Sequence, residues 1–197
     1  MKTKWLALLP LLFLLAGCQT PLGARAGMVD LTYDHLGAIS FDVAHVEVVD
    51  VWSSPMTSPN VEHLFPTRPA QAIHRWARDR IDPVGESGVL RVIIREASVV
   101  EDRDVRDWSD WRGWLDPTRP VRYDGLLAVD IVVDKPSRAW SGKAEVVATR
   151  RIHLPADISP VERDRRWVAM LERMMWDLNK GIEEAIDTYL KDVVATP

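Results

Sequence analysis

The sequence predicts an α+β domain with two layers: one mixed, mostly antiparallel four-stranded sheet, and two helices on one face of it. Two observations carry this prediction. Four segments alternate apolar and polar residues with the period of two that strands show, and two further segments repeat apolar residues every three or four positions, as helices do. The elements follow one another as strand, helix, strand, strand, strand, helix. Packing the apolar side of each helix on the apolar face of the sheet buries both.

The four strands are expected over residues 39–52, 89–101, 122–134 and 144–154. The apolar phase shifts at two places, which indicates a change of buried face near His45 and a β-bulge near Glu96. Short links join the last three strands, and this favours an antiparallel meander. A helix connects the first two strands, so these two strands are expected to be parallel.

The two helices are expected over residues 69–82 and from residue 160 to about 192. Each begins with a proline, which fits the first turn of a helix. Ser159 and Glu162 have the spacing of a capping box at the start of the long helix. Gly181 indicates a bend in that helix, because glycine weakens a helix by about 1 kcal/mol relative to alanine.

The long helix also carries a methionine-rich stripe, formed by Met170, Met174 and Met175. Such a stripe can serve as an adaptable binding surface. Its spacing is that of an ordinary buried helix face, which favours packing on the sheet.

The first seventeen residues have the features of a secretory signal peptide. Lys2 and Lys4 precede an uncharged apolar run over residues 5–15, and small residues follow it. A run of this length is too short to cross a bilayer core, which takes about twenty helical residues. We expect residues 1–17 to be removed on export, and no other apolar run in the sequence reaches spanning length.

Leu15, Ala16, Gly17 and Cys18 resemble the lipobox of bacterial lipoproteins. The resemblance implies a diacylglycerol thioether on Cys18, cleavage before it, and acylation of the new amino terminus with palmitate-type chains. Two or more acyl chains hold a protein stably on a membrane. The next residue is Gln19 and not the aspartate that retains enterobacterial lipoproteins in the inner membrane. The resemblance therefore implies a location in the cell envelope, on the periplasmic side, with the outer membrane favoured over the inner. The alternative is an ordinary signal peptide followed by a chance cysteine.

Composition divides the mature chain into two parts. Residues 18–37 contain glycine and proline with little apolar periodicity, and we interpret them as the lipidated N-terminus and a flexible tether. Residues 38–197 form a single domain, interrupted by a charged, tryptophan-rich excursion over residues 102–121. The net charge of −4 becomes −6 once Lys2 and Lys4 are removed, so no nucleic-acid partner is expected.

Trp108, Trp111 and Trp114 recur every three residues within the excursion. They are candidates for a contact with membrane headgroups, where tryptophan is enriched. They are also candidates for a protein-partner hot spot, because tryptophan and arginine dominate such sites. The alternative, slightly favoured, is that they fold back on the open face of the sheet and simply cover it.

The sequence contains no recognisable catalytic, metal or cofactor motif. The five histidines show no metal-ligand spacing, and there is no nucleophile elbow or phosphate-binding loop. Glu62-His63, in the proline-rich segment 53–66, is interpreted as part of a polar loop that packs on the domain. We therefore expect no enzyme, no cofactor and no metal. An enzyme would require polar groups of His45, His63 or His153 to converge in one cleft.

Four stretches resemble a group of uncharacterised bacterial lipoproteins: PNVEHLFP (59–66), RWARDRI (75–81), VIIREASVVE (92–101) and RYDGLLAVDI (122–131). The group has no assigned activity, so the resemblance transfers no site residues. The lipobox and the element order resemble, more loosely, the auxiliary lipoproteins of ABC-type lipid transporters and the accessory lipoprotein of lipopolysaccharide assembly. Those proteins place two helices on a small sheet.

Together these features favour a membrane-anchored, non-enzymatic accessory subunit that binds an envelope protein complex in lipid transport or outer-membrane assembly. The alternative is a carrier that holds a lipid or another small apolar ligand between the long helix and the sheet. A carrier requires an apolar cavity of a few hundred Å³ at that place.

Overall fold

The computed structural model describes residues 31–103 and 120–195. Its main sheet has the strand order β2-β4-β5-β6, with β2 parallel to β4 and the other neighbours antiparallel. The strands are β2 (His45–Asp50), β4 (Val89–Asp102), β5 (Pro120–Lys135) and β6 (Trp140–Pro155). This arrangement confirms the predicted mixed sheet, the meander and the parallel first pair. The bulge is also confirmed, since the register between β4 and β5 shifts between Ile94 and Glu96.

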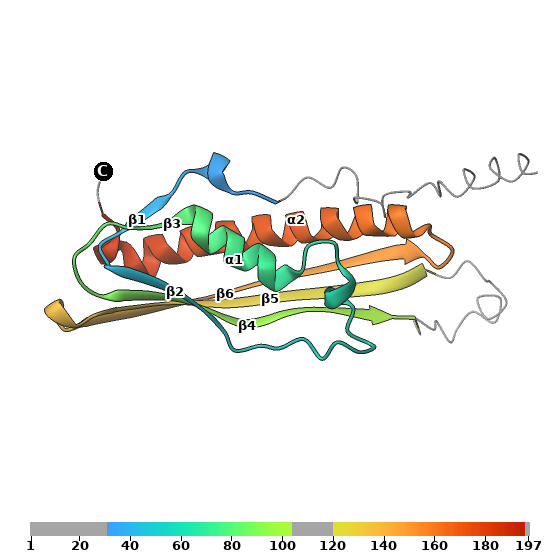
Figure 1. Ribbon diagram of the computed structural model, residues 1–197, viewed down its shortest axis with the longest axis horizontal. Coiled ribbons are helices and arrows are strands. Elements are labelled where there is room, and N and C mark those ends of the chain that lie inside the picture. Colours follow the sequence, from blue (N-terminus) through green and yellow to red (C-terminus); the bar gives the residue numbers. More distant parts are fainter. Residues whose placement is uncertain (1–30, 104–119, 196–197) are drawn as a thin grey trace, which may run out of the picture.

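Both helices lie on the same face of the sheet, as predicted (Figure 1). Helix α1 (Pro69–Arg80) packs on β2 and β4, whereas the longer α2 (Pro160–Ala185) lies mainly over β6. The expected cap is present, because the Ser159 hydroxyl accepts a hydrogen bond from the Glu162 amide at 3.3 Å. None of the described helices is both long enough and apolar enough to cross a membrane.

The prediction of one strand over residues 39–52 is wrong. The chain divides there into β1 (Ile39–Phe41) and β2. Strand β1 pairs in parallel with β3 (Ile81–Pro83), and the two form a separate two-stranded sheet that the sequence did not indicate. The expected change of buried face at His45 corresponds to the start of β2, where the chain has moved from one sheet to the other.

Asp42 holds the chain where it passes between the two sheets. The Lys135 ammonium, only 4% exposed, donates to the Asp42 carbonyl at 2.8 Å and forms an ion pair with its carboxylate. This hydrogen bond, together with the charges of Lys135 and Arg138, lowers the pKa of the Asp42 carboxyl. A buried ammonium needs such acceptors, so the contact fixes the crossing point against the β5–β6 turn.

The last two strands are longer than predicted. Strand β6 begins at Trp140 instead of residue 144, and a short 3₁₀ turn (Pro136–Arg138) connects it to β5. Ala139 adopts a left-handed conformation with φ 50° to complete the turn. The aromatic ring of Trp140 covers Gly142, where a Cβ atom would lie 2.5 Å from the ring. The strand therefore starts earlier than its apolar alternation suggests.

The predicted bend at Gly181 is wrong, because α2 continues through this residue to Ala185. A π-helical turn (Ile186–Leu190) and a 3₁₀ turn (Lys191–Val193) complete the C-terminal segment. A Cβ atom on Gly181 would lie 2.7 Å from Val146 Cγ1 on β6. The glycine thus allows α2 to approach the sheet closely.

The interface between α2 and the sheet is filled by side chains. Met170, Met174 and Met175 are all buried there, which confirms that the methionine stripe belongs to the core. Opposite them, a Cβ atom on Gly125 of β5 would lie 2.6 Å from Met174 Sδ and 2.7 Å from Met170 Cε. At this point the interface lacks room even for a methyl group.

Residues 31–37, which the sequence analysis placed in the tether, are packed on the helices. Tyr33 is only 6% exposed, and its amide donates to Asp79 on α1 at 3.3 Å. The Leu31 carbonyl accepts from Arg75 at 3.1 Å, and a 3₁₀ turn (Asp34–Leu36) follows. The packed domain therefore extends back at least to Leu31.

A buried polar network joins this N-terminal segment to both helices. The Arg80 guanidinium, on α1, donates to the Leu36 carbonyl at 2.7 Å and to Asn179 Oδ1 at 3.3 Å, and it pairs with the Glu183 carboxylate. Asn179 Oδ1 also accepts from the Trp76 indole at 2.9 Å. Each buried donor of the network thus has an acceptor.

Gly181→Ala tests the close approach of α2 to the sheet. We expect the free energy of unfolding to fall, because overpacking a tight contact costs about 1–3 kcal/mol, more than the gain of about 1 kcal/mol in helix propensity. Urea denaturation measures the difference, with the exposed Lys180→Ala as the matched control. A rise in stability would instead identify Gly181 as a weak point of the helix.

Candidate functional site

The segment from Val51 to Arg68 lies along the part of β4 that β2 leaves uncovered. β2 pairs with β4 only as far as Ile94. Beyond it, the Val61 amide donates to the Val99 carbonyl, and the Glu101 amide donates to the Pro59 carbonyl, both at 2.8 Å. The segment, called the edge loop below, therefore satisfies backbone groups that would otherwise form an open sheet edge.

Glu62 holds the edge loop in place. Its side chain is buried and accepts hydrogen bonds from the Val99 amide at 3.1 Å, from Asn60 Nδ2 at 3.3 Å and from the Ser54 hydroxyl. This confirms the interpretation of the Glu62-His63 pair as part of a polar loop that packs on the domain. The sequence did not indicate that the carboxylate is the anchoring group.

A pocket of about 420 Å³ lies between the edge loop and the start of α1. Its polar lining comes from Asp50, Ser53, Ser54, Glu62, His63, Arg68, Gln71 and His74. His74 Nε2 lies 2.9 Å from both carboxylate oxygens of Asp50, and both side chains are about half exposed. His74 is thus the boundary residue of the helix that the apolar pattern indicates.

The polar groups of this pocket do not combine into a nucleophile and its base. The Ser54 hydroxyl donates to the buried carboxylate of Glu62, whereas the imidazole of His74 contacts Asp50. His63 Nδ1 is buried and has no hydrogen-bond partner among the described residues. Nucleophilic catalysis needs the hydroxyl and the imidazole within hydrogen-bond reach of each other. As arranged here, the pocket can bind a polar group and contains no activated nucleophile.

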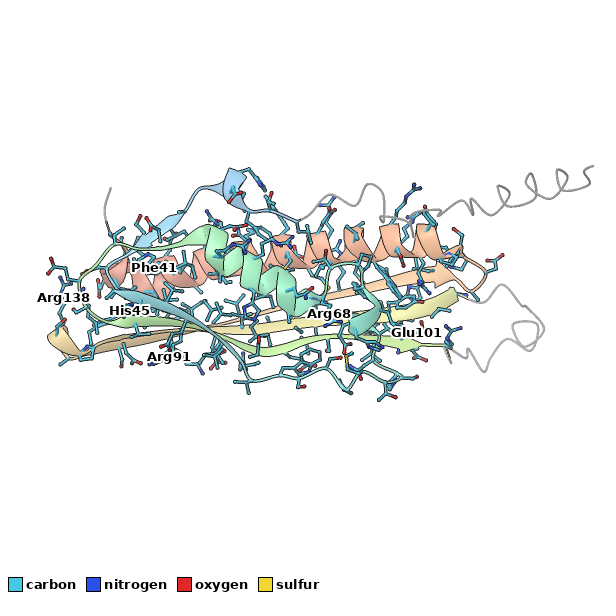
Figure 2. The ribbon with its side chains drawn as sticks, in the orientation of Figure 1. Phe41, His45, Arg68, Arg91, Glu101 and Arg138 are labelled. Carbon is cyan, nitrogen blue, oxygen red and sulfur yellow. The ribbon has the colours of Figure 1, made fainter. Side chains whose placement is uncertain are left out.

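The histidines that an enzyme would have to bring together lie far apart. His45 begins β2 at one end of the sheet, whereas His153 pairs with Arg122 at the other end. Figure 2 shows these two ends, marked by His45 and Glu101. His63 lies in the edge loop. Within residues 31–103 and 120–195, no group of three or more histidine, cysteine, aspartate or glutamate side chains could hold a metal ion.

The sheet face opposite the helices carries alternating acidic and basic side chains (Figure 2). Arg91 on β4 contacts Glu47 on β2 at 2.9 Å and Asp134 on β5 at 2.7 Å. Asp130, only 4% exposed, contacts Arg95 at 2.6 Å. Further ion pairs join Arg122 to Asp102 and Asp124, Arg151 to Asp124, and Lys143 to Asp130 and Glu145. The face is polar and largely neutralises its own charges.

An aromatic cluster lies where α2 begins. The Trp167 ring stacks on Phe65 with centroids 4.6 Å apart, meets Tyr123 edge-on at 5.6 Å, and is covered by the Arg163 guanidinium at 4.4 Å. Burial and a hydrogen bond to Glu101 raise the pKa of Tyr123 to about 12. The cluster joins the edge loop, β5 and α2 at the end of the sheet from which the tryptophan-rich excursion departs.

The site residues that the sequence singled out lie outside the described residues. This holds for the lipobox (Leu15, Ala16, Gly17 and Cys18) and for Trp108, Trp111 and Trp114. Their roles stay predictions. The groups that the structure does bring together were missed, because each joins residues far apart in the sequence. The only signal for them was a polar or charged residue at a buried helical position, such as Arg80 four residues after Trp76.

Glu62→Ala tests the anchoring of the edge loop. The substitution leaves the Val99 amide and the Ser54 hydroxyl without their acceptor, so we expect a loss of about 1–3 kcal/mol in the free energy of unfolding. Hydrogen exchange at the amides of Val61 and Glu101 should become faster. Glu86→Ala, at an exposed glutamate, is the matched control. Unchanged exchange in the Glu62 variant would mean that the loop is held by its backbone bonds alone.

No protein-family model and no curated protein matches the sequence. Three solved structures resemble the chain at low similarity. Rare lipoprotein B from Shewanella oneidensis is 11% identical, with 74% of this chain and 96% of that chain covered and a TM-score of 0.37. A minor lipoprotein from Acinetobacter baumannii is 10% identical, with 78% and 96% covered and a TM-score of 0.33. A Xanthomonas campestris protein of the DUF330 family is 9% identical, with 74% and 88% covered and a TM-score of 0.33. At these TM-scores the likeness supports no conclusion about this chain.

Proposed function

We propose that this chain is a lipid-anchored protein of the bacterial cell envelope. In this proposal it acts as a non-enzymatic accessory subunit that binds a protein complex in lipid transport or outer-membrane assembly. The observation that carries the proposal is the run Leu15-Ala16-Gly17-Cys18 directly after a signal-like apolar segment. The single cysteine of the chain stands where a lipobox requires its thiol.

The packed N-terminal segment limits how far an anchored domain could lie from the membrane. The domain extends back to Leu31, so only residues 19–30 separate it from Cys18. Even fully extended, this length of chain reaches at most about 45 Å. A domain so held remains close to the membrane that carries its lipid, which suits a subunit that acts on partners at the same surface.

The arrangement of polar groups favours binding over catalysis. The described residues hold neither a metal cluster nor a hydroxyl paired with an imidazole. The filled interface between α2 and the sheet, with no room for a Cβ atom at Gly125, speaks against a carrier that holds its ligand there. The accessory role therefore stands ahead of the carrier.

We place the partner contact at the end of the sheet where β4 and β5 are joined. Trp108, Trp111 and Trp114 belong to the segment between these strands. Three tryptophans interleaved with arginine have the composition of an interface hot spot. An envelope protein is the proposed partner, and membrane headgroups are the alternative contact.

Cys18→Ser tests the anchor in the full chain produced in an exporting bacterium. Loss of the acceptor thiol should move the protein from the membrane fraction to the soluble periplasmic fraction, and intact mass should show that the acyl chains are absent. Gln19→Asp is the matched control, because it keeps the thiol. In an enterobacterial host it should remain lipidated and shift to the inner membrane. An unlipidated Cys18 in the unsubstituted chain would overturn the proposal.

Crosslinking in intact cells, followed by purification from solubilised membranes, tests the partner. The unsubstituted chain should carry subunits of an envelope complex with it. Replacing Trp108, Trp111 and Trp114 by alanine should reduce this recovery at least tenfold, a modest loss for a tryptophan hot spot. The mass of the lipid on Cys18 should stay the same. Recovery of a lipidated protein alone would contradict the accessory role.

A further inference from the structure

A second pocket lies on the outer side of α2, away from the sheet. It is a groove of about 360 Å³ between the N-terminal segment and the helix. Leu31, Tyr33 and Leu36 line one wall, and Met175 and Trp176 line the other. This apolar lining, with a few polar groups beside it, is typical of sites for small apolar ligands.

Tyr33 supplies an unused polar group at this groove. The side chain is more than nine-tenths buried, and its hydroxyl has no hydrogen-bond partner within the described part of the chain. Burial raises the pKa of Tyr33 well above its ordinary value, so the group remains a neutral donor under physiological conditions. A buried hydroxyl without a partner is costly and rare. An acceptor atom supplied by a ligand in the groove would remove that cost.

Trp176 is the second unusual feature of the groove. Its indole is 56% exposed, although the neighbouring Met175 is fully buried. An exposed tryptophan beside an apolar groove matches the residues that proteins place at the level of lipid headgroups. It offers a ligand an apolar contact that the folded chain itself does not use.

We propose that this groove binds one acyl chain of a membrane phospholipid, with its ester carbonyl accepting a hydrogen bond from the Tyr33 hydroxyl. The methylene groups then lie along Met175, Trp176 and Leu36. The site differs from the carrier site considered above, because it lies outside the core. For the source of its lipid the inference rests on the proposed anchor, which keeps Leu31, at the edge of the groove, within about 45 Å of the membrane.

The test uses the full chain, reconstituted into vesicles of phosphatidylethanolamine and phosphatidylglycerol. A small fraction of the phospholipid carries a photoactivatable diazirine in one acyl chain, and mass spectrometry locates the crosslinked peptides. We expect label on residues 31–36 and 172–179. Tyr33→Phe keeps the shape of the side chain and removes the donor. It should lower this labelling about fivefold to tenfold, the value of one hydrogen bond. The exposed Tyr189→Phe is the matched control and should leave labelling unchanged.

Thermal unfolding in detergent without phospholipid gives an independent result. Tyr33→Phe should unfold at the same temperature as the unsubstituted chain or at a higher one, because it removes a buried hydroxyl that lacks a partner. A lower unfolding temperature would assign the hydroxyl a structural role and overturn the proposal. Equal labelling of the Tyr33 variant and the unsubstituted chain would overturn it as well.

Two further outcomes separate this inference from the anchor. The intact mass of the same samples reports the lipid on Cys18. A labelled groove in a chain without that lipid would support the binding site and remove the anchor, and a lipidated chain with an unlabelled groove would do the reverse. Occupation of the groove by the lipid of Cys18 itself would exclude the added phospholipid. It would therefore also leave the groove unlabelled and overturn the proposal.

Discussion

The buried guanidinium of Arg80 is the interaction on which the upper layer of the molecule depends. Its side chain is only 4% exposed, and a cation taken out of water is tolerated only when its donors are paired. The acceptors come from three separate parts of the chain: the Leu36 carbonyl, Asn179 on α2 and Glu183 on α2. The N-terminal segment, α1 and α2 must therefore dock together, because the absence of any one of them leaves the charge uncompensated.

This docking determines where the candidate surfaces lie. It fixes the N-terminal segment beside α2 and so creates the groove that contains Tyr33 and Trp176. It also fixes the orientation of α2, whose opposite side fills the space over Gly125. The same contact that closes the core to a ligand thus opens a groove outside it. The Lys135–Asp42 pair, at the far end of the sheet, holds the crossing from β1 to β2 in a similar manner.

The sequence predicted those elements whose pattern is local. Strands β4 and β5, the bulge near Glu96 and the cap at Ser159 each follow from neighbouring residues. The division of the first strand did not, because β1 and β3 are three residues long and too short to show a period. Tyr33 lies buried against Asp79, 46 positions further along, and no local pattern announces such a contact. Glycine in a helix fits both a bend and a close approach, and only the partner surface distinguishes them. Of the candidate site, sequence predicted the loop character of Glu62 but not its acceptor role, while Cys18 and the three tryptophans rest on sequence alone.

The edge loop has a consequence for life on a surface. Proteins restricted to a membrane plane meet copies of themselves far more often than proteins that diffuse in three dimensions, and their orientations are partly aligned. Under such conditions an open strand edge is a standing invitation to stack into fibrils. By hydrogen-bonding β4 beyond the end of β2, the edge loop removes that template over the far half of the strand. A buried glutamate in a proline-rich loop thus contributes to keeping a crowded population of these molecules dispersed.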